Sequence, residues 1–177
     1  MTYRNITIDS RGLLTGASLS ALGADYYAGA LLPKSLPGPT VEFSPLFVPR
    51  DYDLSRPSAL TIVFEPNSDQ GTSVYAIKFR LLEALIAPDG TISEFVFNSL
   101  FTTPASWTKT TYWQFQNPFS GNPFWEPHEL ADVRSIGFRI ARRGQDSEDT
   151  YPGDIRIGLS CELDYPVKCQ FLGRGAI

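Results

Sequence analysis

Apolar and polar residues alternate along much of the second half of the chain, with the spacing of half-buried β-strands. The longest alternation places an apolar residue at every second position: Ile155, Ile157, Leu159, Cys161, Leu163 and Tyr165. Because successive side chains of a strand point to opposite faces, this pattern predicts a strand with one buried face. Residues 134–142 alternate in the same way, with Ile136, Phe138 and Ile140 on one side.

Shorter runs of β-branched and aromatic residues, separated by turn residues, predict six further strands. They cover residues 3–8, 41–48, 58–65, 72–87, 94–103 and 108–116. The turn sequence Pro88-Asp-Gly90 predicts a hairpin between the fourth and fifth of these runs. The leucine-rich part of the fourth run, residues 81–85, also suits a helix by content, but its aromatic and β-branched start favours a strand.

The segment 10–56 has no clear periodicity. Its prolines oppose a helix and a central strand, and a short helix over residues 13–22 is weakened by glycines. Such a long irregular stretch indicates either an extended arm that packs on a partner or elements that the pattern does not reveal. In the first case its apolar side chains need a partner surface. The interface candidates in this segment are Tyr26, Tyr27, Leu31, Leu32 and Leu36.

These patterns predict an all-β fold, an antiparallel β-sandwich of jelly-roll-like form with an irregular N-terminal arm. The length of 177 residues fits one domain. We expect the N-terminal strand and arm over residues 1–56 and the sandwich core over 57–177, with the sandwich starting near residue 41. The 14 glycines and 14 prolines suit short strands joined by frequent turns.

Charge and composition exclude several classes of function. The net charge of −4 opposes direct binding of nucleic acid. No apolar run reaches the roughly 20 residues of a membrane-spanning helix, and no signal peptide is visible, so we expect a soluble protein made in a cytoplasm. A single histidine, His128, and two cysteines, Cys161 and Cys169, match neither a catalytic triad nor a structural zinc site. We therefore expect no enzymatic activity, no metal and no cofactor.

Two clusters leave alternatives open. The acidic loop at residues 144–154, next to Arg142 and Arg143, predicts a local network of ion pairs or a solvated loop rather than a calcium site. An aromatic cluster runs from Trp107 to Trp125 and fits sandwich core, a protein interface or a sugar-binding surface. From this cluster the interface candidates are Trp113, Phe119 and Trp125.

Two stretches of sequence carry a resemblance to a known group. The first is VPRDYD at 48–53 followed by LTIVF at 60–64. The second is IGFRIAR at 136–142, then DTYPGDIRI at 149–157, closing on ELDY. Together they resemble the small jelly-roll structural proteins of tailed bacteriophages, the capsid decoration or cement proteins.

The resemblance implies a component of the virion, on the capsid exterior, that is assembled in the host cytoplasm. Its expected partners are the major capsid protein and further copies of itself, as a homotrimer, with the N-terminal arm carrying much of the assembly contact. The alternative function is a carbohydrate-binding or adaptor module of a phage tail or host-recognition structure. A small glycosidase is the third hypothesis, and no carboxylate pair with a recognisable setting supports it.

Overall fold

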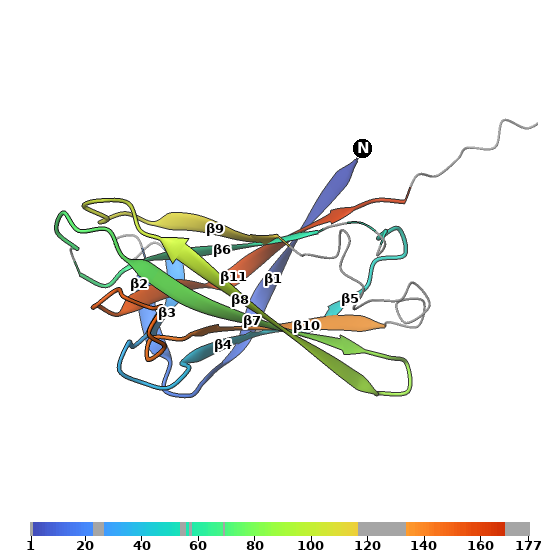
Figure 1. Cartoon of the computed structure of the whole chain (residues 1–177). Coiled ribbons are helices and arrows are strands. Elements are labelled where there is room, and N and C mark those ends of the chain that lie inside the picture. Colours follow the sequence, from blue (N-terminus) through green and yellow to red (C-terminus); the bar gives the residue numbers. More distant parts are fainter. Residues whose placement is uncertain are drawn as a thin grey trace, which may run out of the picture.

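The computed structural model describes residues 2–22, 27–53, 56, 58–68, 70–116 and 134–168. These residues form an all-β fold of antiparallel strands, which confirms the predicted β-sandwich of jelly-roll type (Figure 1). The strands are β1 (Tyr3–Leu14), β2 (Ser18–Leu22), β3 (Tyr27–Leu32), β4 (Thr40–Phe43), β5 (Leu46–Phe47), β6 (Ala59–Pro66), β7 (Ala76–Ile86), β8 (Ile92–Thr102), β9 (Thr111–Gln116), β10 (Ser135–Arg142) and β11 (Ile155–Pro166).

The strands form two sheets. In sheet A, β11 is central: one edge pairs with β6, which pairs with β9, and the other edge pairs with β3 and with the first part of β1. Strand β2 pairs with β3. In sheet B, β10 lies between β7 on one edge and β4 and β5 on the other, and β8 pairs with β7.

Strand β1 belongs to both sheets. Residues 3–9 pair with β11 in sheet A, and residues 10–14 pair with β4 in sheet B. The register with β4 shifts between Ser10 and Gly12, which leaves Arg11 as an extra residue in β1. An extra residue of this kind bends a strand and increases its twist. The bulge therefore lets one strand turn the corner between the two layers.

The core lies between the sheets, on the faces that alternation predicts. Leu60, Ile62 and Phe64 of β6 are buried, as are Ile136, Phe138 and Ile140 of β10. Phe64 is the centre of an aromatic cluster, with edge contacts to the rings of Phe79, Phe101 and Trp107 at centroid distances of 5.1, 4.8 and 5.5 Å. Part of the aromatic content of the sequence is thus core.

The predicted hairpin is confirmed, because β7 and β8 pair without a register shift from Ala76–Thr102 to Ile86–Ile92. The leucines at 81–85 are therefore strand and not helix. The alternation of β11 is interrupted at one place. Ile157 and Cys161 pair with Phe64 and Ile62, so four residue steps of β11 face two of β6. This bulge makes Leu159 half-buried and takes it out of the buried row.

The prediction of an irregular N-terminal arm is wrong. Residues 10–56 contain the end of β1 and the strands β2 to β5, all of them paired within the two sheets. The suggested helix over residues 13–22 is a strand end, a turn and β2. Leu32 is fully buried, because its pairing with Ile155 points it into the core. Much of the apolar surface of residues 10–56 is thus buried within the domain.

Candidate functional site

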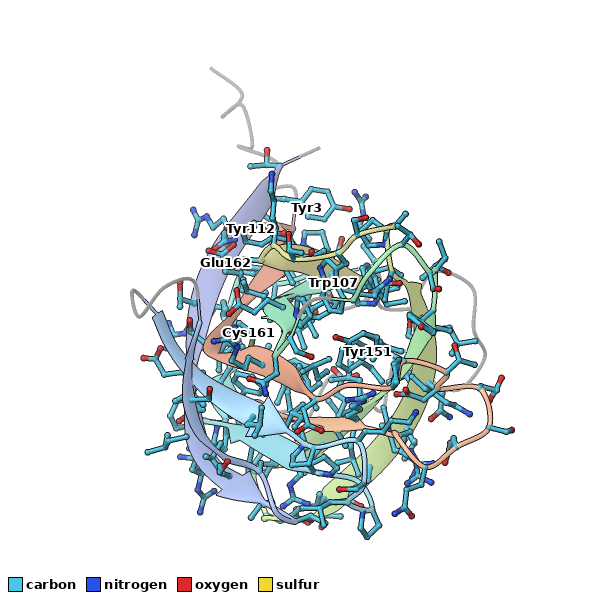
Figure 2. The ribbon with its side chains drawn as sticks, turned by 90° about the vertical axis from the view of Figure 1, so that its left-hand side faces the viewer. Tyr3, Trp107, Tyr112, Tyr151, Cys161 and Glu162 are labelled. Carbon is cyan, nitrogen blue, oxygen red and sulfur yellow. The ribbon has the colours of Figure 1, made fainter. Side chains whose placement is uncertain are left out.

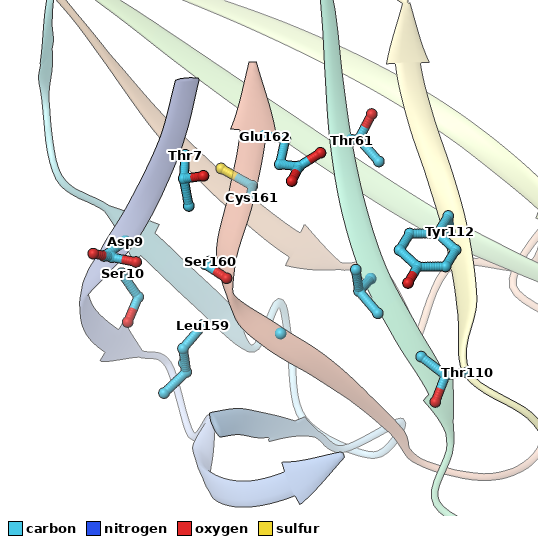
Figure 3. Close-up of a pocket in the computed structure, with 12 residues that line it drawn as sticks. Thr7, Asp9, Ser10, Thr61, Thr110, Tyr112, Leu159, Ser160, Cys161 and Glu162 are labelled. Carbon is cyan, nitrogen blue, oxygen red and sulfur yellow. The ribbon is translucent and has the colours of Figure 1, made fainter. Parts of the chain in front are cut away.

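A groove of about 420 Å³ lies on the outer face of sheet A (Figure 3). It crosses four neighbouring strands, β1, β11, β6 and β9. Most of its lining surface is apolar, and hydroxyl groups, two carboxylates and one tyrosine ring are placed among the apolar atoms. A volume of this size suits a small ligand or one or two sugar rings. The lining residues are Thr7, Asp9, Ser10, Thr61, Val63, Thr110, Tyr112, Gly158, Leu159, Ser160, Cys161 and Glu162.

The strand register assembles the polar side of the groove. Glu162 pairs with Thr7 on one side and with Thr61 on the other, so the three residues form a row straight across β1, β11 and β6. Asp9 pairs with Ser160 one step further along. The carboxylate Oε2 of Glu162 accepts a hydrogen bond from Asn5 Nδ2 at 3.3 Å. This bond orients the carboxylate at the border of the groove.

The aromatic side of the groove is set by the alternation of β9. Trp113 pairs with Ile62 and packs inward against Phe101, at a ring-centroid distance of 5.0 Å. Tyr112 pairs with Val63 and therefore points outward, where its side chain is 70% exposed. An exposed ring next to Val63 offers an apolar surface beside the polar row.

The bulge in β11 shapes the floor of the groove. It turns Leu159 to the outer face, while Cys161 is buried below the surface. Burial raises the pKa of the Cys161 thiol to about 12, and the carboxylates of Asp9 and Glu162 add to the shift. A thiol with such a pKa stays protonated at neutral pH and is a weak nucleophile.

The structure separates the residues that sequence analysis chose as interface candidates. Leu32 is core, Leu31 is half-buried, and Leu36 is exposed. Trp113 is half-buried and packs against the core, so it is not a surface ring. Tyr27 lies in β3, but its side chain lies outside the described residues, as do Tyr26, Phe119, Trp125 and the histidine at 128.

The sequence gives no indication of Glu162 and the other polar groove residues, and Tyr112 belongs to the aromatic cluster from Trp107 to Trp125 without being one of its interface candidates. The available signal was weak: the alternation of TTYWQF makes either Tyr112 or Trp113 the exposed ring. The row through Thr7 and Glu162 joins residues that lie 155 positions apart in sequence. Only the strand pairing brings them together, so no local motif reveals them.

The acidic loop forms local ion pairs, as predicted. Lys78 Nζ contacts Asp146 at 3.2 Å and also Glu148, and Arg143 contacts Asp146 at 3.3 Å. The side chains of Asp149 and Thr150 accept the backbone N–H groups of Lys78 and Ala76 in β7. The side chain of Tyr151 is buried and packs against the ring of Trp107 (Figure 2).

The described residues contain no candidate metal site and no candidate membrane-spanning helix. Across residues 2–116 and 134–168, apart from the short gaps within them, no group of three or more His, Cys, Asp or Glu side chains is placed to hold a metal ion. Within the same residues, no helix has the length and apolar character needed to cross a membrane.

Comparison with known proteins gives a likeness of fold. No protein-family model matches the chain, and no curated protein matches it. Among solved structures, a chain of the infectious bursal disease virus Gx strain is 15% identical with a TM-score of 0.44, over 93% of this chain and 33% of that one. The family 11 carbohydrate-binding module of cellulosomal cellulase Lic26A-Cel5E from Clostridium thermocellum is 14% identical with a TM-score of 0.39. The match covers 96% of this chain and 91% of the module.

A third similar structure is the enzymatically active domain of tailspike protein 4 from bacteriophage CBA120. It is 8% identical, with a TM-score of 0.41, over 90% of this chain and 19% of that one. This chain therefore spans about a third of the viral chain and a fifth of the tailspike chain. All three TM-scores are below 0.5, and neither fold nor function is carried over from these structures to this chain.

Proposed function

We propose that this domain binds carbohydrate in the groove on sheet A, without catalysing a reaction. The observation that carries the proposal is the exposed ring of Tyr112 beside a row of hydroxyl and carboxylate groups. This is the carbohydrate-binding alternative from the sequence, with Tyr112 in the place expected for Trp113 or Trp125.

The chemistry of the groove matches that of a sugar. A pyranose ring has an apolar face of C–H groups that packs on an aromatic ring, and hydroxyls around its rim that need hydrogen-bond partners. Asp9 and Glu162 supply acceptors, while Thr7, Thr61 and Ser160 supply groups that both donate and accept. A groove of about 420 Å³ on the open face of sheet A accommodates one or two sugar rings.

A binding role without catalysis also agrees with the chemistry at the floor. The protonated, buried thiol of Cys161 is unsuited to nucleophilic attack. Asp9 and Glu162 sit in a solvent-facing groove of hydroxyl groups, where they act as hydrogen-bond acceptors.

A glycan array followed by calorimetry on the best ligand tests the proposal. We expect the wild-type chain to bind at least one oligosaccharide, and Tyr112→Ala and Glu162→Gln to weaken binding by tenfold or more, which is about 1.4 kcal/mol or more each. The matched control is Tyr3→Ala, because Tyr3 is an exposed tyrosine outside the groove. An array without ligands, or unchanged affinity of Tyr112→Ala, would refute the proposal.

The second candidate function is the capsid cement role that the sequence resemblance implies. One observation favours it: Leu14, Leu19 and Leu36, all within residues 10–56, keep exposed side chains, and that of Leu19 is 77% exposed. Leu36 packs against Gly16 in the turn between β1 and β2. Exposed apolar groups at one turn suit docking on a protein surface. In this case the partner is the major capsid protein on the virion exterior, and the expected self-association is a trimer.

Co-sedimentation with expanded capsids tests the cement role. If it holds, the chain pellets with the capsids and Leu19→Lys releases it, while Val74→Lys at an exposed apolar site in the loop before β7 does not. A chain that stays in the supernatant under all conditions rules out this role and leaves the carbohydrate proposal untouched.

A further inference from the structure

Strand β8 is the last strand of sheet B among the described strands (Figure 1). One side of β8 pairs with β7 along all eleven residues, and no other described strand pairs with it. The hydrogen bonds from Ala87 N to Thr91 O and from Thr103 N to Tyr75 O lie at the two ends of this register. Because hydrogen-bonded pairs alternate along an antiparallel ladder, odd-numbered residues of β8 bond to β7. The N–H and C=O groups of the even-numbered residues therefore point away from β7.

The side chains of these even-numbered residues are exposed as well, and half of them are apolar. Ile92, Val96 and Leu100 are 57%, 51% and 43% exposed. Soluble proteins usually protect a long sheet edge with lysine, proline or a bulge. Strand β8 has none of these, and Glu94 is its single charged residue. By contrast β2, at the edge of sheet A, is five residues long.

We propose that β8 pairs with β8 of a second copy, antiparallel, about a two-fold axis at Val96. Each chain then completes the ladder of the other, and sheet B continues through the dimer. A strand that pairs with its own copy about a two-fold axis forms a closed, isologous contact, so the assembly stops at two chains.

The side chains of β8 select this register. With the axis at Val96, Val96 faces Val96 of the second copy, Ile92 faces Leu100, and Glu94 faces the amide of Asn98. Apolar groups thus meet apolar groups, and each carboxylate meets a hydrogen-bond donor. An axis at Glu94 places two carboxylates opposite each other, which is destabilising. An axis at Phe97 places Glu94 against Leu100 and Val96 against Asn98.

The neighbouring strand extends the match. Leu82 of β7 pairs directly with Val96, and Ile86 pairs with Ile92. In the dimer, Leu82 and Val96 of both chains form an apolar row across four strands on the outer face of sheet B. An axis at Asn98 is the strongest competitor, since it places Val96 against Leu100. It leaves Ile92 without a partner and sets Glu94 against a threonine instead of an amide.

Light scattering coupled to size-exclusion chromatography tests the association. The wild-type chain is expected to be a dimer, and Val96→Lys a monomer, because it places two ammonium groups face to face at the axis. The control Val74→Lys, outside the strand, should stay dimeric. A wild-type monomer or trimer overturns the proposal, as does a Val96→Lys variant that stays dimeric. Far-ultraviolet circular dichroism checks that the variant is folded.

Disulfide trapping tests the register, with Cys169→Ser as the background. Opposed Cα atoms in a hydrogen-bonded antiparallel pair are about 5.5 Å apart, a distance that a disulfide spans. We expect Val96→Cys to form covalent dimers on oxidation and Asn98→Cys to stay largely monomeric on a non-reducing gel. The reverse result overturns the axis at Val96. The groove on sheet A takes no part in this contact, so the outcome is independent of carbohydrate binding.

Discussion

Arg142 donates two parallel hydrogen bonds to Asp149, from Nε to Oδ2 and from Nη2 to Oδ1, each 3.0 Å long, between two fully buried side chains. Its remaining donors reach the carbonyl oxygens of Tyr151 at 3.0 Å and Gly153 at 2.6 Å. Asp149 in turn accepts the N–H of Lys78 in β7. The pair thus holds the loop between β10 and β11 against sheet B.

Removing the charge of Arg142 should be strongly destabilising. Arg142→Met leaves the carboxylate of Asp149 buried, with Lys34 as its remaining charged partner at 3.2 Å. We expect a loss of about 3 kcal/mol or more in the free energy of unfolding, measured with urea. The double variant Arg142→Met with Asp149→Leu removes both charges and should recover part of the loss. If the free energy of unfolding of Arg142→Met lies within about 1 kcal/mol of the wild-type value, the pair is not a stabilising contact.

Gly144 cannot accept a side chain. A Cβ at this position would lie 2.6 Å from the carbonyl oxygen of Lys34 and 2.9 Å from its Cα, and both are backbone atoms that have little freedom to move. Gly144→Ala should therefore lower the free energy of unfolding by about 1–3 kcal/mol. Gly137→Ala is the control, because its Cβ would meet Ala84 at an ordinary 3.9 Å. Equal stability of the two variants in urea would contradict this account.

Glu83 makes stability depend on pH. Burial raises its pKa to about 8 from an ordinary value of 4.5. Below pH 4.5 the carboxyl is protonated in both states. Between the two pKa values the unfolded chain loses this proton while the folded chain keeps it, so the free energy of unfolding falls as pH rises. Above about pH 8 the carboxyl is ionised in both states, and its whole contribution to the free energy of unfolding has been lost.

Glu83→Gln removes this pH-dependent contribution to the free energy of unfolding. Between about pH 5 and about pH 9, wild type should lose roughly 2–4 kcal/mol more than the variant, as measured by urea unfolding at each pH. Parallel profiles for wild type and Glu83→Gln would mean that Glu83 is ionised in the folded protein.

The thiol of Cys161 should be unreactive until the chain unfolds. It is buried, and burial raises its pKa to about 12. In a Cys169→Ser background, an aromatic disulfide reagent should modify no thiol in the native protein near neutral pH and one thiol in denaturant. Rapid, complete modification of the native protein would place the thiol within reach of solvent.

The sequence predicts strands where alternation is long and local. Residues 134–142 satisfy this condition because their alternation marks one buried face. The β7–β8 hairpin satisfies it because its turn joins two strands that are neighbours in sequence. The strands between Ser10 and Phe47 do not, since they are short and separated by prolines and glycines, and β3, β4 and β5 pair with strands that lie 88 to 129 positions further along the chain. Leu32 is the clearest case: an apolar residue in an irregular stretch resembles an exposed anchor until its pairing with Ile155 is known.

The groove escapes prediction for a related reason. Tyr112 is exposed because β9 pairs with β6 in one of two possible phases, and the sequence of β9 fits both. The bulge that turns Leu159 outward interrupts an alternation that is unbroken in the sequence. A bulge is specified by the neighbouring strand as much as by the residues that form it.

The central place of β11 has a consequence for synthesis on the ribosome. Its partners β1, β3 and β6 all precede it in the chain and leave the ribosome first. Until residues 155–166 emerge, these strands have no common neighbour, and the edges of β1, β3 and β6 that pair with β11 stay open. Sheet B, whose β7, β8 and β10 are nearer in sequence, can pair earlier. A nascent chain halted just before Ile155 should therefore be protected from protease in the β7–β8 hairpin and cleaved readily in residues 3–9 of β1, whose described partner strand is β11, a state in which chaperones have most to bind.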